Sequence, residues 1–121
     1  MIARFVDAKN IRDITKELKS IECDEKSIDI MAPKGVFRII KIDDVKARDA
    51  IIIKQDMLSI GGEAAIPRNV FDLENSKNVP ILIMGTLKHL KELTLKLDRH
   101  YKSIREISNM IKDLIKRELS D

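Results

Sequence analysis

Hydrophobic and polar positions follow two different spacings along this chain, and the changes of spacing mark its expected elements. Short apolar runs predict strands over residues 2–6, 36–42, 63–66 and 79–84. Apolar residues three or four positions apart predict helices over residues 8–20, 27–34, 45–60, 86–99 and 103–119. Strands and helices mixed this evenly predict an α+β fold, in which helices cover a small mixed sheet of about four strands.

Turn-forming residues support several of these boundaries. Gly35 and the pair Gly61-Gly62 are expected to end helices, because glycine adopts the left-handed conformation at little cost. Asp43-Asp44 predicts a turn and a helix N-cap. Pro67 is expected to end a strand, because proline cannot donate a ladder hydrogen bond.

The side-chain pattern also predicts which surfaces are buried. Residues 36–42 are apolar on both faces except at Arg38 and Lys41, so we expect this strand inside the sheet. The helix over 45–60 is expected to turn one face inward. That face consists of Ala47, Ala50, Ile51, Met57 and Leu58.

Residues 86–121 contain neither glycine nor proline and carry a nearly continuous apolar stripe. The stripe comprises Leu87, Leu90, Leu93, Leu97, Ile104, Ile107, Ile111 and Leu114. Ser103 and Glu106 match a capping box, which predicts two helices in place of one long rod. The stripe is more apolar than one small sheet needs, so we expect it to bury against a second copy in a symmetric homodimer.

Length and composition indicate one globular domain over residues 1–121. The chain is 44% apolar and 36% charged, and this balance is typical of folded proteins. The net charge is only +3 and aromatic residues make up 3%, so we expect no nucleic-acid partner. Nucleic-acid binding through the basic C-terminal helix is kept as the last alternative. Its basic residues are Arg99, Lys102, Arg105, Lys112, Lys116 and Arg117.

The ends and the cysteine content predict a cytoplasmic protein. Cys23 is the only cysteine, which suits a reducing compartment. The N-terminus MIARFVDAKN lacks the apolar core of a signal peptide, and apolar runs of four residues are too short to span a membrane. Frequent Lys and Glu with few amide side chains give a thermophile-like composition.

One segment resembles a known family. Residues 54–65 read KQDMLSIGGEAA. This is similar to the region before the catalytic barrel of some long bacterial and archaeal dihydropteroate synthases. Arg68, the segment LIMGTL over 82–87 and the block over 31–42 match further parts of that region, so the resemblance covers roughly residues 30–97.

The resemblance implies an accessory module and not a synthase. In that family the region precedes a TIM barrel that joins a pterin to p-aminobenzoate. A barrel needs about 200 residues or more, which this chain does not have. We therefore expect a non-catalytic accessory or assembly module linked to pterin or folate-like cofactor biosynthesis, without catalytic residues, metal or cofactor of its own.

The alternative is a small-molecule site, for a pterin or a phosphorylated ligand, built around the same motif. Its candidate residues are Lys54, Gln55, Gly61, Gly62, Glu63, Arg68, Gly85 and Thr86. The two glycine turns would let backbone amides approach a ligand, and a helix N-terminus at Thr86 would favour an anion. Turns of these two kinds are more often an ordinary helix stop and an ordinary N-cap than parts of a ligand site. An enzymatic use of Lys54–Glu63 is left open on the same residues.

Overall fold

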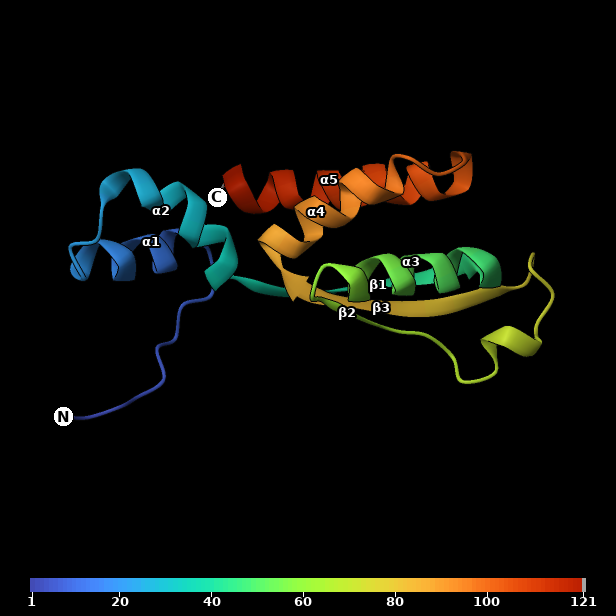
Figure 1. Ribbon diagram of the computed structural model, residues 1–121, viewed down its shortest axis with the longest axis horizontal. Coiled ribbons are helices and arrows are strands. Elements are labelled where there is room, and N and C mark those ends of the chain that lie inside the picture. Colours follow the sequence, from blue (N-terminus) through green and yellow to red (C-terminus); the bar gives the residue numbers. More distant parts are fainter. Residues whose placement is uncertain (121) are drawn as a thin grey trace.

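A computed structural model describes residues 1–120 as a mixed α+β fold, in which helices cover one side of a small sheet (Figure 1). The elements in chain order are α1 (Ile11–Ser20), α2 (Glu25–Met31), the 3-10 turn η1 (Ala32–Gly35), β1 (Phe37–Lys46), α3 (Ala47–Ser59), β2 (Glu63–Ala65), the 3-10 turn η2 (Val70–Asp72), β3 (Asn78–Thr86), α4 (Leu87–Leu97) and α5 (Lys102–Ser120). The predicted fold class is therefore confirmed.

The sheet has three strands among the described residues, where about four were expected. Their order is β1-β3-β2, and both pairings are antiparallel, so the sheet is not mixed. The missing strand is the one predicted over residues 2–6. This segment has no strand partner, and Ile2 and Phe5 are fully exposed. A high strand propensity does not form a strand without an adjacent edge to pair with.

β1 occupies an edge of the sheet, so the prediction that residues 36–42 lie inside it is wrong. The central strand is β3, which pairs on both sides. Asp43-Asp44 does not form a turn either: the register of β1 against β3 shifts between Ile42 and Val45, and β1 continues to Lys46. A bulge of this kind is common on edge strands, where it bends the strand and places charges on an unpaired edge.

The helices α3, α4 and α5 all lie on the same side of the sheet (Figure 1). Alternate residues of β3 are buried against them, and these are Val79, Ile81 and Ile83. On α3 the buried positions are Ala47, Asp49, Ala50, Ile53 and Met57. The predicted inward position of Leu58 is wrong, because the buried face is rotated towards Ile53 and leaves Leu58 48% exposed.

The C-terminal stripe forms two helices, as predicted, and packs largely within the chain. The four buried isoleucines of α5 are Ile104, Ile107, Ile111 and Ile115. The four buried leucines of α4 belong to the same core, and they are Leu87, Leu90, Leu93 and Leu97. Only Leu114 of the predicted stripe is exposed, at 38%. The stripe therefore offers little surface for a second copy, and any self-association has to use another surface.

A buried carboxylate joins α3 to the connection between α4 and α5. Asp49 is 1% exposed and accepts hydrogen bonds from the Tyr101 hydroxyl and from Ser103 Oγ at 2.7 Å. The Ser103 hydroxyl therefore bonds to Asp49 and not to the backbone of its own helix, and the capping box predicted for Ser103 and Glu106 is not formed. The Arg48 guanidinium lies 4.5 Å from the centre of the Tyr101 ring and shields this contact.

We predict that Asp49→Ala lowers the free energy of unfolding by about 2–3 kcal/mol, because hydrogen bonds to a charged group are lost and two hydroxyls lose their acceptor. Urea denaturation followed by circular dichroism measures the effect. Asp113→Ala, at an exposed position of α5, is the control and is expected to change the stability by less than about 0.5 kcal/mol. Equal stability of the two variants would contradict a role for Asp49 in joining the helices.

Candidate functional site

The two glycine turns singled out in the sequence do lie together in the structure. Gly62 and Gly85 both contact the side chain of Met57: a Cβ atom on either glycine would lie 2.3 Å or 2.5 Å, respectively, from Met57 Cε. Gly61 faces His89 of α4, with 3.5 Å between the corresponding Cβ position and His89 Nε2. Met57 and His89 therefore occupy the space between the turns that a ligand would need.

Gly61 and Gly62 end α3 in a Schellman motif. Gly61 has φ +96°, in the left-handed region that favours glycine. Its N–H donates to the carbonyl of Leu58 at 3.2 Å, and the N–H of Gly62 donates to the carbonyl of Met57 at 3.0 Å. These are the two bonds that define the motif. The helix end and the contact with Met57 are sufficient to explain both glycines.

Thr86 caps α4 through a reciprocal pair of hydrogen bonds with His89. The backbone N–H of His89 donates to Thr86 Oγ1 at 3.2 Å, and the N–H of Thr86 donates to His89 Nδ1 at 3.1 Å. A histidine here takes the place that glutamate or glutamine usually has in a capping box. Because the cap engages the backbone N–H of His89, this helix end offers an anion one donor fewer than expected from the sequence.

Lys54 and Glu63 form an ion pair that joins α3 to β2. Lys54 Nζ donates to Glu63 Oε1 at 3.1 Å and to the carbonyl of Ala64 at 2.7 Å. The same carboxylate accepts the N–H of Ala64 at 2.8 Å. This backbone donor, followed by Lys54, lowers the pKa of Glu63. The carboxylate thus stays ionised and paired, which does not suit a general acid.

The remaining predicted site residues are not part of this arrangement. Gln55 is exposed on α3, and Arg68 is exposed in the segment after β2. The structure thus brings together the glycine turns, Thr86 and the Lys54–Glu63 pair around Met57, and it leaves Gln55 and Arg68 outside.

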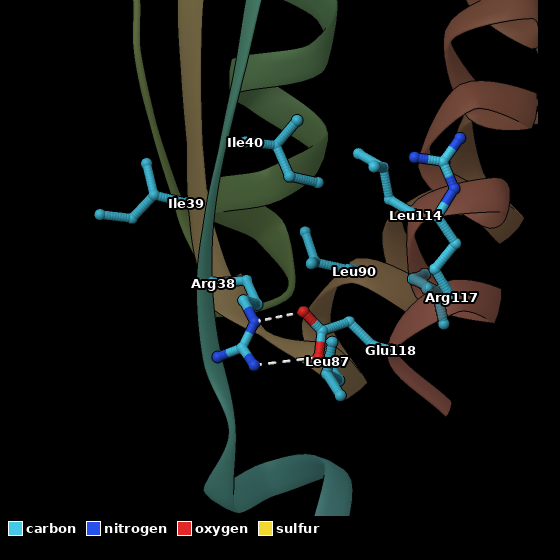
Figure 2. A pocket seen from close by; sticks show the side chains of 9 residues that line it. Arg38, Ile39, Ile40, Leu87, Leu90, Leu114, Arg117 and Glu118 are labelled. Atoms are coloured by element: carbon cyan, nitrogen blue, oxygen red, sulfur yellow. Dashed lines mark hydrogen bonds and ion pairs between the residues drawn. The ribbon is translucent and has the colours of Figure 1, made fainter. Parts of the chain in front are cut away.

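A cavity that the sequence did not reveal lies between β1 and α5 (Figure 2). Its volume is about 250 Å³. The walls are apolar and are formed by Ile40, Leu87, Leu90, Leu114 and Ile115. Arg38, one of two charged residues in the apolar run 36–42, is the sequence feature that could have indicated a polar contact here.

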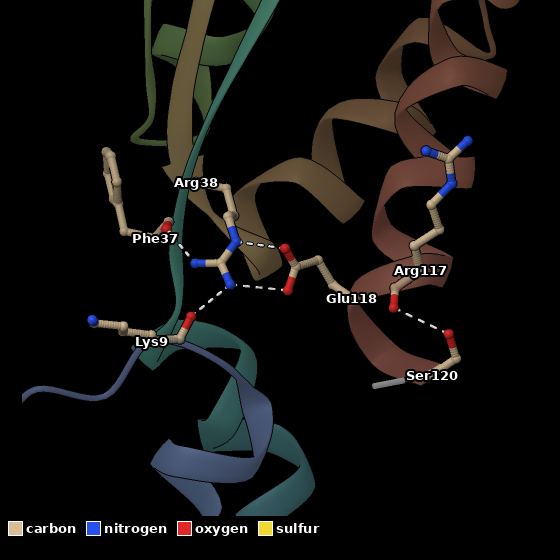
Figure 3. Close-up of polar contacts among 6 residues, drawn as sticks. All are labelled: Lys9, Phe37, Arg38, Arg117, Glu118 and Ser120. Atoms are coloured by element: carbon tan, nitrogen blue, oxygen red, sulfur yellow. Dashed lines mark hydrogen bonds and ion pairs between the residues drawn. The ribbon is translucent and has the colours of Figure 1, made fainter.

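Arg38 forms that contact with the C-terminal end of α5 (Figure 3). Its Nε and Nη2 atoms donate to the two carboxylate oxygens of Glu118 at 2.6 Å and 2.9 Å. Nη2 also donates to the carbonyl of Lys9 at 2.5 Å, and Nη1 donates to that of Phe37 at 3.0 Å. These hydrogen bonds lower the pKa of Glu118 and raise that of Arg38. Two of the charged groups of the cavity, Arg38 and Glu118, are therefore paired with each other, and Arg117 lies at its wall beside the apolar residues.

A second, polar cavity of about 360 Å³ lies beside the Asp49 contact. Its lining residues are Lys46, Arg48, Tyr101, Lys102, Ser103 and Glu106. Burial, and then the neighbouring Asp49 carboxylate, raises the pKa of Tyr101, so that its hydroxyl stays protonated and donates. Asp49 accepts hydrogen bonds from both hydroxyls, and the raised pKa of Tyr101 does not favour its use as a nucleophile.

Within residues 1–120 no group of three or more His, Cys, Asp or Glu side chains is placed to hold a metal ion. No helix in the same range is both long and apolar enough to cross a membrane. Cys23 is half-buried, and its thiol lies 3.4 Å from the carbonyl of Leu18.

An exposed, largely apolar surface lies on the side of the sheet that faces away from the helices. Cross-strand pairing places Ile39 beside Met84, and Lys41 beside Leu82 and Ala65, on this side. Phe37 is 57% exposed, Ile39 61% and Leu82 36%. We call this surface the open face; it consists of Phe37, Ile39, Lys41, Ala65, Pro80, Leu82 and Met84. Lys41 is the only charged residue among these seven, and Glu63, which pairs with Lys54, lies next to Met84 at the edge of the same side.

Comparison with known proteins finds no family model, no curated protein and no solved structure that matches this chain. The similarity to the dihydropteroate synthase extension therefore stays a prediction from the motif residues.

We predict that Glu118→Gln weakens the dependence of stability on acid pH. The pKa of Glu118 is lower in the folded chain than in the unfolded chain, so its contribution is complete above the ordinary value of about 4.3 and is lost as pH falls through the folded pKa. At pH 7 the variant is expected to be less stable by at most about 1 kcal/mol, and at pH 3 the difference should be close to zero.

Thermal unfolding between pH 7 and pH 3 measures this difference. Glu106→Gln is the matched control, because Glu106 lies exposed on the same helix and no ion pair forms there in the described structure. A constant difference between Glu118→Gln and the unchanged chain across this pH range would contradict the pairing of Glu118 with Arg38.

Proposed function

We propose that this chain is a non-catalytic accessory module that works by assembly, and that its binding surface is the open face. The observation that carries the proposal is the one-sided sheet: α3, α4 and α5 cover one face, and the other face carries exposed Phe37 and Ile39. A contiguous exposed apolar patch on a small domain is often an interaction site.

The ionisable side chains that could act in catalysis are already engaged in ion pairs or hydrogen bonds, and this supports binding over catalysis. Lys54 is paired with Glu63, Asp49 is saturated by Tyr101 and Ser103, and Glu118 is bound to Arg38. No buried side-chain nitrogen or oxygen atom among the described residues lacks a hydrogen-bond partner. Catalytic groups in a free site commonly have unsatisfied or strongly perturbed polar atoms, and these contacts leave none here.

The resemblance of the motif indicates the biosynthetic process in which such a module would work. The stretch KQDMLSIGGEAA is similar to a region that precedes the barrel in dihydropteroate synthases, so we assign the module to pterin or folate-like cofactor biosynthesis. In the structure this stretch forms the end of α3, its stop and β2. Its fully buried Met57 packs against both glycine turns, which is a structural use of the motif.

A small-molecule site for a pterin or a phosphorylated ligand is the second candidate. It is favoured by one observation: the turns at Gly61-Gly62 and Gly85-Thr86 meet beside the Lys54–Glu63 pair. A ligand there would have to displace Met57 or His89, and both belong to helices that pack on the sheet.

We predict that the chain self-associates at micromolar concentration, because an assembly module has to bury its open face. Sedimentation equilibrium over about 1–300 µM measures the association. A mass of one chain, 13.9 kDa, over the whole range would contradict self-assembly.

We predict that pterin and phosphorylated pterin do not bind measurably below about 100 µM, since Met57 and His89 fill the space between the turns. Isothermal titration and the shift of the melting temperature are the measurements. Binding that is abolished by Lys54→Ala, but not by the exposed Lys16→Ala, would reverse the order of the two candidates.

A further inference from the structure

We propose that the open face is covered by a second copy of this chain, in a symmetric dimer, and that the N-terminal arm, residues 1–9, of each copy extends over the other. This inference rests on the proposed assembly function and specifies its partner and geometry. It is supported by the total surface of the chain, by the position of the arm and by the size of the open face.

The chain exposes more surface than a folded monomer of its mass. Its accessible surface is 8306 Å², whereas a monomeric protein of 13.9 kDa exposes about 6,700 Å². The excess, about 1,600 Å², is larger than the surface of about 800 Å² that each partner buries in a standard interface. The excess is therefore large enough for one such interface.

The arm contributes apolar residues to this excess. Ile2 is 93% exposed, Phe5 104% and Val6 48%. The arm does not pack on its own sheet: the N-terminus lies far from the body of the chain, on the other side of the sheet from α4 and α5 (Figure 1). The open face and the arm thus lie on the same side of the molecule.

Arg38 determines where the arm begins. It binds the carbonyl of Lys9, so the arm leaves the body next to the start of β1. In Figure 3 the chain runs from Lys9 towards the side on which Phe37 lies, and Phe37 belongs to the open face. An extended arm of nine residues reaches about 30 Å, which is about the length of the nine-residue strand β3.

The open face is too small to hold a dimer without the arms. Its two long strands have ten and nine residues and β2 has three. At about 3.4 Å per residue and 4.8 Å between strands, this gives a face of about 350 Å², less than half of what a standard interface buries on each partner. Two arms, each laid across the partner, supply the missing area.

The pattern of the open face suits a second copy. A twofold axis along the central strand β3 places Leu82 against its counterpart and β1 of one copy over β2 of the other. Lys41 of each copy then lies over Ala65 of its partner, two residues from Glu63 on the edge strand, and no like charges meet at the centre. An isologous arrangement of this kind closes after two copies and leaves no open end for fibre growth.

Sedimentation equilibrium of the full-length chain and three variants tests the dimer. Ile39→Glu places a charge on the open face at an exposed position, and deletion of residues 2–6 removes the arm's apolar side chains. Each is expected to raise the dissociation constant of the dimer at least tenfold. Leu95→Glu on α4, at an equally exposed position (63%), is the matched control and should leave it unchanged. Far-ultraviolet circular dichroism checks that each variant is folded.

The outcomes separate this inference from the proposed function. A dimer that forms with unchanged affinity in both test variants leaves self-assembly standing and overturns the open-face dimer. Weakening by Ile39→Glu alone overturns the exchange of arms. A chain that is monomeric throughout overturns the assembly function as well.

A cross-linking experiment tests the symmetry independently. Cys23 is the only cysteine, so Cys23→Ser gives a background in which one introduced thiol reports its own position. Two packed sheets lie about 10 Å apart, which fits a short bis-maleimide. Leu82→Cys is expected to give a covalent dimer and Leu95→Cys is not; equal yields from the two would overturn the placement of β3 on the axis.

Discussion

The architecture depends on how α5 is held over the sheet at both of its ends. At its N-terminal end Asp49 of α3 binds Tyr101 and Ser103, and at its C-terminal end Glu118 binds Arg38 of β1. Between these polar contacts the buried isoleucines of α5 complete the core. Because a buried carboxylate is tolerated only with its full set of hydrogen bonds, the Asp49 contact also determines the position of the α4–α5 connection.

This arrangement places all the covering material on one side of the sheet. The helices α3, α4 and α5 share a core with the inner residues of β1 and β3, and the outer residues of the same strands have no helix against them. A small antiparallel sheet can expose one face to water, but that face is then usually polar. Here Phe37, Ile39 and Leu82 are apolar, and the proposal of a binding role rests on this difference.

The motif most similar to a known family has a clear structural use. Met57 packs against Gly62 and Gly85, so that α3, its stop and the end of β3 meet at one side chain. A Cβ atom at either place would lie within 3 Å of Met57 Cε, so the methionine side chain would have to move. The Lys54–Glu63 pair then joins the helix to β2. A sequence segment can therefore be specific to a family because its packing is specific, without containing reactive groups.

The sequence by itself determined the helices, the strands β1, β2 and β3 and the stop at Gly61-Gly62, since periodicity and glycine conformation are local properties. It also indicated that Lys54, Glu63 and the two glycine turns belong together. Only the tertiary structure decided that β1 is an edge strand, that Asp43-Asp44 is a bulge and that residues 2–6 have no partner, because strand pairing joins residues far apart in the chain. The contacts of Asp49 and Arg38 bridge 54 and 80 positions, and no local pattern indicates which distant side chain a charge will meet.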